Sequence, residues 1–359
     1  MAMTLTPERQ RMLDGEKGKT LAKVMKTDLK RRTPAGLHDL TPEAYAQKRG
    51  IERKIEKIFE GYGYRFISSP TLEYRAVFEG KGGLPTARMY GFPDQNGDML
   101  ALRPDMTPAA ARIAATHPRL GLGEKPLRLC YIEKAFRNQE YLQGKDGEFT
   151  QAGAELYGVC SPDADAEMVA LAVESLKTAG LRGFRVDIGQ VDFLRGVLEG
   201  SGLDDACRRA VARLMLSHDY VGVEHLIEAS GETVTESARV ILSDLTRWIG
   251  GADVLKQAEA FASHPLSVAA LRHLEEVYEL LNHKNLNDYV LFDLSMTGHF
   301  DYYTGIVFRG YASGAGYAVV DGGRYDNLLA AFGKASPAVG FGIRLEGLMD
   351  ALNGGGRLC

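Results

Sequence analysis

The chain has 359 residues, 45% of them hydrophobic and 25% charged, which is the composition of a folded protein with a sizeable core. A formal net charge of -4 argues against nucleic acid as a partner, since proteins that bind phosphates usually carry a basic surface. The four cysteines lack the spacing of a zinc site or a disulfide framework, and no apolar run suits a membrane span or a secretory signal, so the sequence predicts a cytoplasmic protein without a metal or other cofactor.

Residues 1–33 differ in composition from the rest of the chain. They are rich in Lys and Arg, hold few large apolar residues, and permit a helix from about Thr6 to Lys26. We expect an N-terminal extension, helical or mobile, that lies outside the core. One domain is predicted for residues 34–352, followed by a short tail at 353–359.

The domain begins with clear helix and turn signals. Thr41-Pro42 supplies an N-cap and a first-turn proline for a helix that glycines end about 20 residues later. A strand then runs to Pro70, and Asn96-Gly97 predicts a hairpin. Thr107-Pro108 predicts the start of the next helix.

The rest of the domain alternates between strands and helices. "LRLCYIEKAFR" and "GEFTQAGAELYGV" predict strands on either side of a polar loop, Ser161-Pro162 starts a helix that ends at Gly180, and "FRVDIGQ" is a strand. Residues 192–288 lack alternation and predict a mainly helical insertion, after which strands return. The pattern predicts an α+β fold, with a largely antiparallel sheet flanked by helices, and not a βαβ nucleotide-binding fold.

Polar residues that could bind a ligand fall into three clusters. "LRPDMTP" places Asp105 and Thr107 where a strand leads into a helix. A second cluster runs from Arg137 to Gln151 and Glu155, and the last two share a strand face because they alternate. The third cluster contains Tyr302 and Tyr303 in "HFDYYTGIVF", together with Arg324 and Tyr325 in "GGRYDNLL".

The residue types in these clusters suit a small polar ligand. Asp105 and Glu155, beside Gln151, suit a cationic amine or an imidazole. Arg137 suits a carboxylate or a phosphate. Each residue alone is more often an ordinary surface or structural group. The pattern by itself therefore supports only an α+β protein with a polar pocket.

At these clusters the sequence resembles histidyl-tRNA synthetase, and more closely the non-catalytic paralogue of that enzyme, the regulatory subunit of ATP phosphoribosyltransferase. "SSPTLEY" carries the motif 1 proline of class II synthetases, "AFRNQE" with "FTQAGAE" resembles motif 2, and "PAVGFGIRLEGL" resembles motif 3. "LRPDMTPAAAR", "HFDYYTGIVF" and "GGRYDNLL" resemble segments typical of the histidine enzymes. The likeness spans roughly residues 34–352 in order, and it implies a class II synthetase-like fold.

The departures from the synthetase pattern concern its chemistry. Gly298 stands where the synthetases carry an arginine, three residues before the Asp of Asp-Tyr-Tyr, and Gly347 stands at the arginine of motif 3. Gln139 replaces a motif 2 glutamate. Adenylation builds negative charge that arginines stabilise, so we expect this chemistry to be lost. Because the chain ends just past motif 3, we also expect no anticodon-binding domain.

The resemblance implies a ligand-binding set for L-histidine, because the amino-acid side of the pocket is kept: Asp105, Thr107, Arg137, Gln151, Glu155, Tyr302 and Tyr303. It implies a regulatory subunit without catalytic residues, which joins the short-form catalytic subunit of ATP phosphoribosyltransferase in a hetero-oligomer. That complex would start histidine biosynthesis and be inhibited by histidine. Two alternatives stay open: an active amino-acid-activating enzyme, and a paralogue that serves another regulatory complex.

The resemblance also implies a homodimer formed through the motif 1 region. We expect its contacts around Pro70, as in class II proteins, with symmetric use of one surface. The apolar helix face of Ile51, Ile55, Ile58 and Phe59 would help to support that interface.

Overall fold

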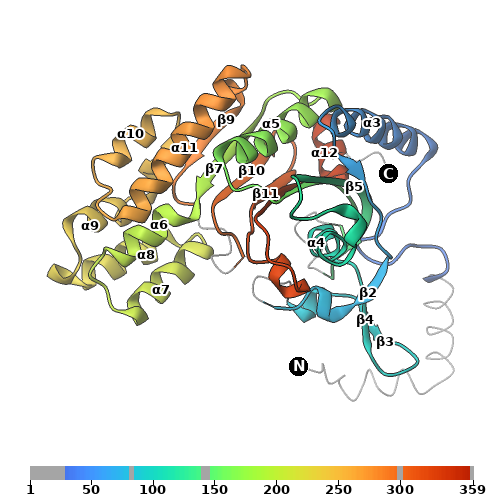
Figure 1. The fold of residues 1–359 in the computed structure, drawn as a ribbon, viewed down its shortest axis with the longest axis horizontal. Coiled ribbons are helices and arrows are strands. Elements are labelled where there is room, and N and C mark those ends of the chain that lie inside the picture. The colour runs from blue at the N-terminus through green and yellow to red at the C-terminus, as the bar shows by residue number, and fades with distance from the viewer. Residues whose placement is uncertain (1–28, 81–84, 139–145, 297–301, 356–359) are drawn as a thin grey trace, which may run out of the picture.

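The computed structural model describes residues 29–80, 85–138, 146–296 and 302–355. The expected helix near the N-terminus and the polar loop after residue 138 lie almost wholly outside these residues, as do Gly298 and Gln139. The described chain forms two sheets and the helices packed on them (Figure 1).

A large sheet organises the described residues. Nine strands follow the order β1-β5-β6-β12-β11-β10-β7-β9-β8. Neighbouring strands are antiparallel, except that β1 pairs with β5 and β7 with β9 in parallel. The predicted α+β fold is confirmed, and the sheet is mixed. The strand bounds are β1 Arg65–Phe66, β5 Leu127–Phe136, β6 Glu148–Tyr157, β7 Phe184–Gln190, β8 Ile249–Gly250, β9 Val290–Asp293, β10 Ile306–Ala312, β11 Val320–Arg324 and β12 Ala338–Arg344.

Helices α3 (Pro42–Gly61), α5 (Pro162–Ala179) and α12 (Leu345–Leu352) cover one face of this sheet (Figure 1). Two of them begin where predicted, because the side chains of Thr41 and Ser161 accept the backbone N–H three residues later. α5 ends at Gly180, whose φ of 105° suits glycine. The ring of Phe59 meets that of Phe341 edge-on at 6.0 Å between centroids, which joins α3 to β12.

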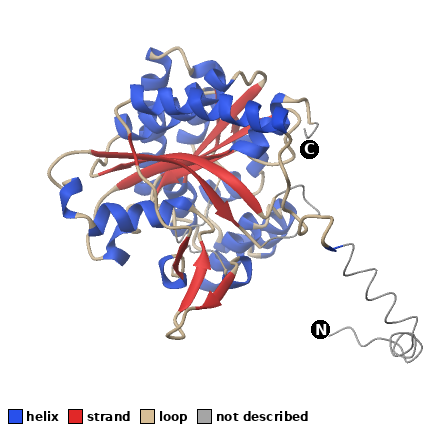
Figure 2. Ribbon diagram, turned by 90° about the vertical axis from the view of Figure 1, so that its right-hand side faces the viewer, coloured by secondary structure: helices blue, strands red, loops and turns tan. Residues whose placement is uncertain are grey.

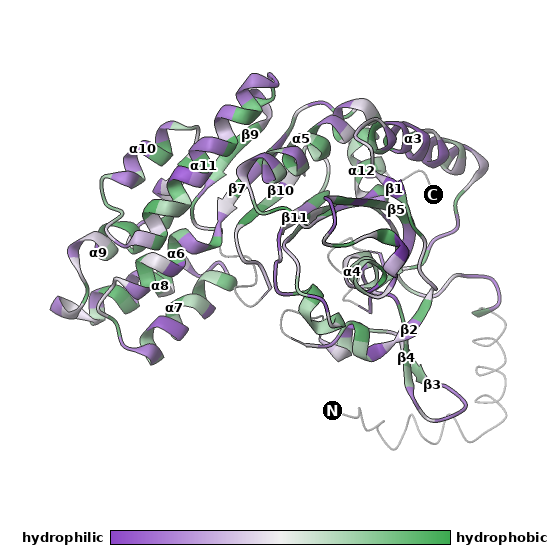
Figure 3. Ribbon diagram, viewed as in Figure 1, coloured by the Kyte–Doolittle hydropathy of each residue, from purple (hydrophilic) through white to green (hydrophobic). Residues whose placement is uncertain are grey.

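The apolar face of α3 belongs to the core of the protomer itself. Ile51, Ile55 and Phe59 are almost completely buried and pack in the main core cluster with residues of α5, and Ile58 is partly buried against them. The helix presents mainly hydrophilic residues on the surface visible in Figure 3. The expectation that this face supports a dimer interface is therefore wrong, since the same apolar period serves equally well to bury a helix on its own sheet.

The region predicted as a helical insertion is built mainly of helices, which gather at one end of the molecule (Figure 1). The two-residue strand β8 interrupts them and extends the large sheet beside β9. Trp248, the one tryptophan of the chain, is fully buried among these helices. The bounds are α6 Val191–Glu199, α7 Asp205–Leu216, α8 Tyr220–Ala229, α9 Glu236–Leu242, α10 Asp253–Glu259 and α11 Pro265–His283.

A small sheet projects from the opposite end (Figure 2). It contains β2 (Leu72–Tyr74), β4 (Met99–Leu102) and β3 (Gly91–Pro93) in that order. The predicted hairpin at Asn96-Gly97 joins β3 to β4, with Gly97 at a φ of 90°. α4 (Met106–Thr116) follows and returns the chain toward the large sheet. None of the helices described is both long and apolar enough to span a bilayer.

Candidate functional site

The sheet face opposite α3 and α5 carries the predicted polar side chains. In the ladder between β6 and β12, Gln151 pairs with Arg344 and Glu155 pairs with Gly340. A Cβ atom at Gly340 would lie 1.7 Å from Oε2 of Glu155, and one at Gly342 would lie 2.5 Å from Nε2 of Gln151. The glycines of motif 3 are therefore required because they leave room for polar side chains that lie flat on the sheet.

Asp105 is the centre of one half of the site. Its carboxylate caps α4 by accepting the Thr107 N–H at 2.9 Å, accepts Nε2 of Gln151 at 3.3 Å, and accepts Nη2 of Arg137 at 2.5 Å. Arg137 also donates from Nε to the Pro104 carbonyl at 2.8 Å. The prediction that Thr107-Pro108 starts the helix is corrected: α4 begins at Met106, since the Asp105 side chain provides the N-cap.

Glu155 is the centre of the other half. Its side chain is fully buried, and its two oxygens accept hydrogen bonds from the hydroxyls of Tyr131, at 2.9 Å, and Tyr325. Burial raises the pKa of Glu155 to about 7, and the hydroxyl donors, chiefly Tyr325, offset part of that rise. The Thr107 hydroxyl lies 3.4 Å from that of Tyr131 and links this half to Asp105.

The two signature tyrosines complete the network. Tyr302 stacks on Tyr325, with ring centroids 5.6 Å apart, and meets Tyr303 edge-on at 4.9 Å. Tyr303 lies against Gly323 of β11, where an added Cβ would come within 2.6 Å of its ring. All seven predicted site residues thus belong to one network, in which Tyr131 and Tyr325 link the two halves and the tyrosine pair. Sequence reasoning did not select Tyr131, although its place on the strand face that faces Gly153 could have indicated it.

A pair of arginines adds positive charge beside Asp105. The guanidinium carbon of Arg344 lies 3.9 Å from the centre of the Phe149 ring, and that of Arg137 lies 5.3 Å from the same ring. Burial, and next the charge of Arg137, lower the pKa of Arg344 to about 10, so the group remains a cation at neutral pH. No sequence pattern marked Arg344 as a site residue beyond its position in motif 3.

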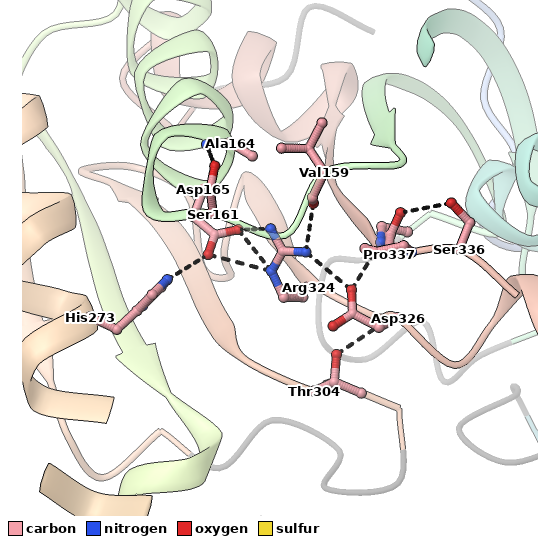
Figure 4. A network of polar contacts seen from close by, with 11 residues as sticks. Val159, Ser161, Ala164, Asp165, His273, Thr304, Arg324, Asp326, Ser336 and Pro337 are labelled. Atoms are coloured by element: carbon pink, nitrogen blue, oxygen red, sulfur yellow. Dashed lines mark hydrogen bonds and ion pairs between the residues drawn. The ribbon is translucent and has the colours of Figure 1, made fainter. Parts of the chain in front are cut away.

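A buried ion pair anchors the signature segments to the scaffold (Figure 4). Arg324 of β11 donates to fully buried Asp165 of α5, at 2.5 Å from Nη2, and to Asp326 at 3.1 Å. His273 of α11 lies 2.8 Å from the same Asp165 carboxylate, so the helical insertion shares the anchor. The Thr304 N–H donates to the Arg324 carbonyl at 2.8 Å, which fixes the chain just after Tyr302 and Tyr303.

The position of the missing motif 3 arginine is occupied by another side chain. A Cβ atom at Gly347 would lie 2.9 to 3.2 Å from ring atoms of Tyr317. Tyr317 therefore covers the space into which a side chain at position 347 would extend. The other departures, Gly298 and Gln139, lie outside the described residues.

The fold and this face define a class II aminoacyl-tRNA synthetase-like protein. Motifs 2 and 3 occupy the adjoining strands β5, β6 and β12 of the large sheet, and motif 1 ends in β2 of the small sheet. The family model described as histidyl-tRNA synthetase matches residues 36–348. The chain belongs to this family.

Within the family, the chain is similar to regulatory subunits. It is 37% identical over 322 residues to an ATP phosphoribosyltransferase regulatory subunit of Acetivibrio thermocellus, covering 89% of this chain and 76% of that protein. It is 39% identical over 319 residues to the protein of that name in Thermoanaerobacter pseudethanolicus, covering 89% and 82%.

Solved structures agree with these sequence relatives. A Bacillus halodurans structure described as an ATP phosphoribosyltransferase regulatory subunit/histidyl-tRNA synthetase gives a TM-score of 0.82 at 34% identity, covering 90% of this chain and 83% of that one. A histidyl-tRNA synthetase from Nostoc sp. PCC 7120 gives 0.75 at 22% identity, covering 90% and 75%, and shows the shared fold alone. The relatives place the chain with the regulatory subunits that are paralogous to the synthetase.

Proposed function

We propose that this chain regulates a catalytic ATP phosphoribosyltransferase, performs no aminoacylation chemistry, and senses L-histidine in its synthetase-like pocket. The relatives named above support the regulatory role. The observation that carries the non-catalytic part is glycine at position 347, beside the ring of Tyr317, which would have to move to admit a side chain there. One electrostatic donor to the transition state is worth about 10²–10³ in rate, so its loss alone is severe.

A pyrophosphate exchange assay tests this part directly. The chain is incubated with ATP, labelled pyrophosphate and each amino acid in turn, with an active histidyl-tRNA synthetase as the positive control. We expect no exchange above background with histidine. Exchange that depends on histidine would instead support the alternative, an amino-acid-activating enzyme.

The sensor function uses the seven residues around Asp105 and Glu155. Asp105 and Thr107 are partly exposed, and Gln151 is buried beside Asp105, so this group suits contact with the amino group or imidazole of histidine. Glu155 lies beneath them and already accepts hydrogen bonds from the hydroxyls of Tyr131 and Tyr325. It therefore contributes by positioning those two rings, or by accepting a hydrogen bond from the ligand in place of one tyrosine hydroxyl.

The sensor is tested by histidine inhibition of the complex reconstituted with a short-form catalytic subunit. A hydrogen bond to a charged group contributes about 1.5–3 kcal/mol, so Asp105→Asn and Glu155→Gln are expected to raise the inhibitory histidine concentration about ten-fold or more. Asp98→Asn, in the exposed β3–β4 hairpin, is the matched control. If both pocket variants fold and keep the wild-type inhibition curve, these groups serve only the structure of the sheet, and histidine binds elsewhere.

The proposal includes a homodimer formed through the small sheet and β1. Large apolar side chains are exposed there in one protomer: Phe66 at 42%, Leu72 at 40%, Tyr74 at 55% and Phe92 at 45%. Such a grouping on strands β1, β2 and β3 suits a symmetric interface. Light scattering at micromolar concentration should give the mass of two chains, and a monodisperse monomer would contradict the proposal.

A further inference from the structure

Arg344 is the cation of the pocket that has no partner in the described structure. It is the last residue of β12, its backbone N–H donates to the Val319 carbonyl at 2.9 Å, and its backbone pairs with Gln151 across the ladder. Its guanidinium lies on the Phe149 ring and makes no hydrogen bond or ion pair with any residue that the structure describes. The side chain is therefore held in place by stacking, with its donors left for another group.

Arg137, by contrast, is already committed. It donates to the Pro104 carbonyl and forms an ion pair with Asp105, so its charge is balanced and two of its nitrogens are in use. The pKa of Arg344 is lowered because the side chain is desolvated and because the charge of Arg137 lies nearby. Two guanidinium groups over one aromatic ring repel each other, and an anion bound to Arg344 would relieve that repulsion.

We propose that Arg344 is the anion-binding residue of the pocket and that it binds the α-carboxylate of the amino-acid ligand. The inference rests on the sensor function proposed above and names the group that recognises the acid end of its ligand. Gln151 lies between the two charges that a zwitterion needs: it pairs with Arg344 through the backbone and contacts Asp105 through its side chain. An amino acid across Gln151 would set its carboxylate on Arg344 and its ammonium group toward Asp105.

Two features favour a carboxylate over a phosphate. A single unpaired guanidinium matches the two oxygens of one carboxylate in a planar, bidentate contact, whereas a polyphosphate needs several cations. The Asp105 carboxylate shares the pocket and disfavours a second, multiply charged anion. Arg344 is also the last residue of β12, three positions before Gly347. It therefore lies beside Gln151 on the sheet face, and not in the space beside Gly347 that Tyr317 fills.

The test crosses a change in the protein with a change in the ligand. L-histidine and L-histidinol, which has a CH₂OH group in place of the carboxylate, are titrated calorimetrically into the wild type, Arg344→Gln and Arg309→Gln, each alone and in complex with the catalytic subunit. Arg309 is the matched control, since it lies on the same sheet face two strands away and pairs with Asp321 at 3.1 Å. Inorganic pyrophosphate is titrated separately.

We expect Arg344→Gln to weaken L-histidine binding ten- to one hundred-fold and to leave histidinol binding unchanged, because only the first ligand has a carboxylate to lose. Arg309→Gln should match the wild type with both ligands. Arg344→Lys keeps the charge but not the planar fork, so an intermediate loss for L-histidine is expected, and this variant carries the test if the glutamine variant does not fold.

Three results would overturn the inference. Unchanged histidine affinity in Arg344→Gln removes the residue from recognition, and an equal loss for histidine and histidinol shows that it acts only through the shape of the pocket. Pyrophosphate binding that Arg344→Gln abolishes while histidine binding persists assigns Arg344 to a phosphate. A wild-type complex that binds no histidine at all is a different outcome, because it contradicts the sensor function itself together with this inference.

Discussion

The buried carboxyl group of Glu155 should make the stability of this protein fall as the pH rises through neutrality. Burial raises its pKa from 4.5 to about 7 in the folded chain. Between these values the folded protein retains a proton that the unfolded chain has released, so the contribution of Glu155 to stability is fully present below pH 4.5 and is lost as the pH passes 7. This direction is opposite to that of an ion-paired carboxylate.

The magnitude follows from the size of the shift. Each pKa unit corresponds to about 1.4 kcal/mol, so the Glu155 shift predicts a loss of about 2 to 3 kcal/mol between pH 5 and pH 8. Glu155→Gln removes the titrating group while keeping its volume and one hydrogen-bond acceptor. The free energy of unfolding of the wild type, measured relative to this variant, should therefore decrease by that amount across the range.

The assay is urea unfolding followed by circular dichroism at several pH values for both proteins. Subtracting the two profiles cancels every titration they share, so the difference reports Glu155 alone. Tyr325→Phe is an informative third protein, because the Tyr325 hydroxyl is the donor that offsets the pKa rise most. Its removal should move the midpoint of the pH dependence above 7. Parallel profiles for the wild type and Glu155→Gln, or a difference that grows with pH, would refute the reasoning.

Further substitutions test the packing of the site and of the proposed interface. Gly340→Ala should destabilise the fold by about 2 kcal/mol or more, because its Cβ would overlap the Glu155 carboxylate. Gly50→Ala, in open space on α3, should instead stabilise it by about 0.5–1 kcal/mol. Urea unfolding measures both, and a tolerated Gly340→Ala would contradict the close approach to Glu155. Asp165→Ala leaves buried Arg324 with Asp326 as its one remaining carboxylate partner and should cost about 3–5 kcal/mol in the same experiment. A cost below about 1 kcal/mol would mean that the network is not an anchor. Tyr74→Glu should give a monomer by light scattering, while Ile249→Glu, at another exposed apolar position on β8, should leave the dimer intact. A Tyr74→Glu dimer would move the interface elsewhere.

Much of the fold was determined by short-range patterns in the sequence. Thr41 and Ser161 predict the starts of their helices, because an N-cap depends on a hydrogen bond to a backbone N–H only three residues away. Asn96-Gly97 predicts a hairpin because the turn that joins the two strands depends on these adjacent residues. The alternation of Gln151 and Glu155 placed both on one strand face, and the resemblance at the signature segments gathered the remaining site residues.

The tertiary structure decided what each of these groups contacts. An apolar helix period does not say which surface covers it, so Ile51 and Phe59 could be assigned to the core only once α5 was seen to pack against them. The donors to Glu155 come from different strands, and Tyr325 is 170 positions away in the chain, beyond the reach of any local pattern. Arg344 differs from the exposed arginines because folding partly buries it against the Phe149 ring, beside Arg137, which is paired with Asp105. Charge, burial and partner all depend on that arrangement, because they are properties of neighbours in space and not of neighbours in sequence.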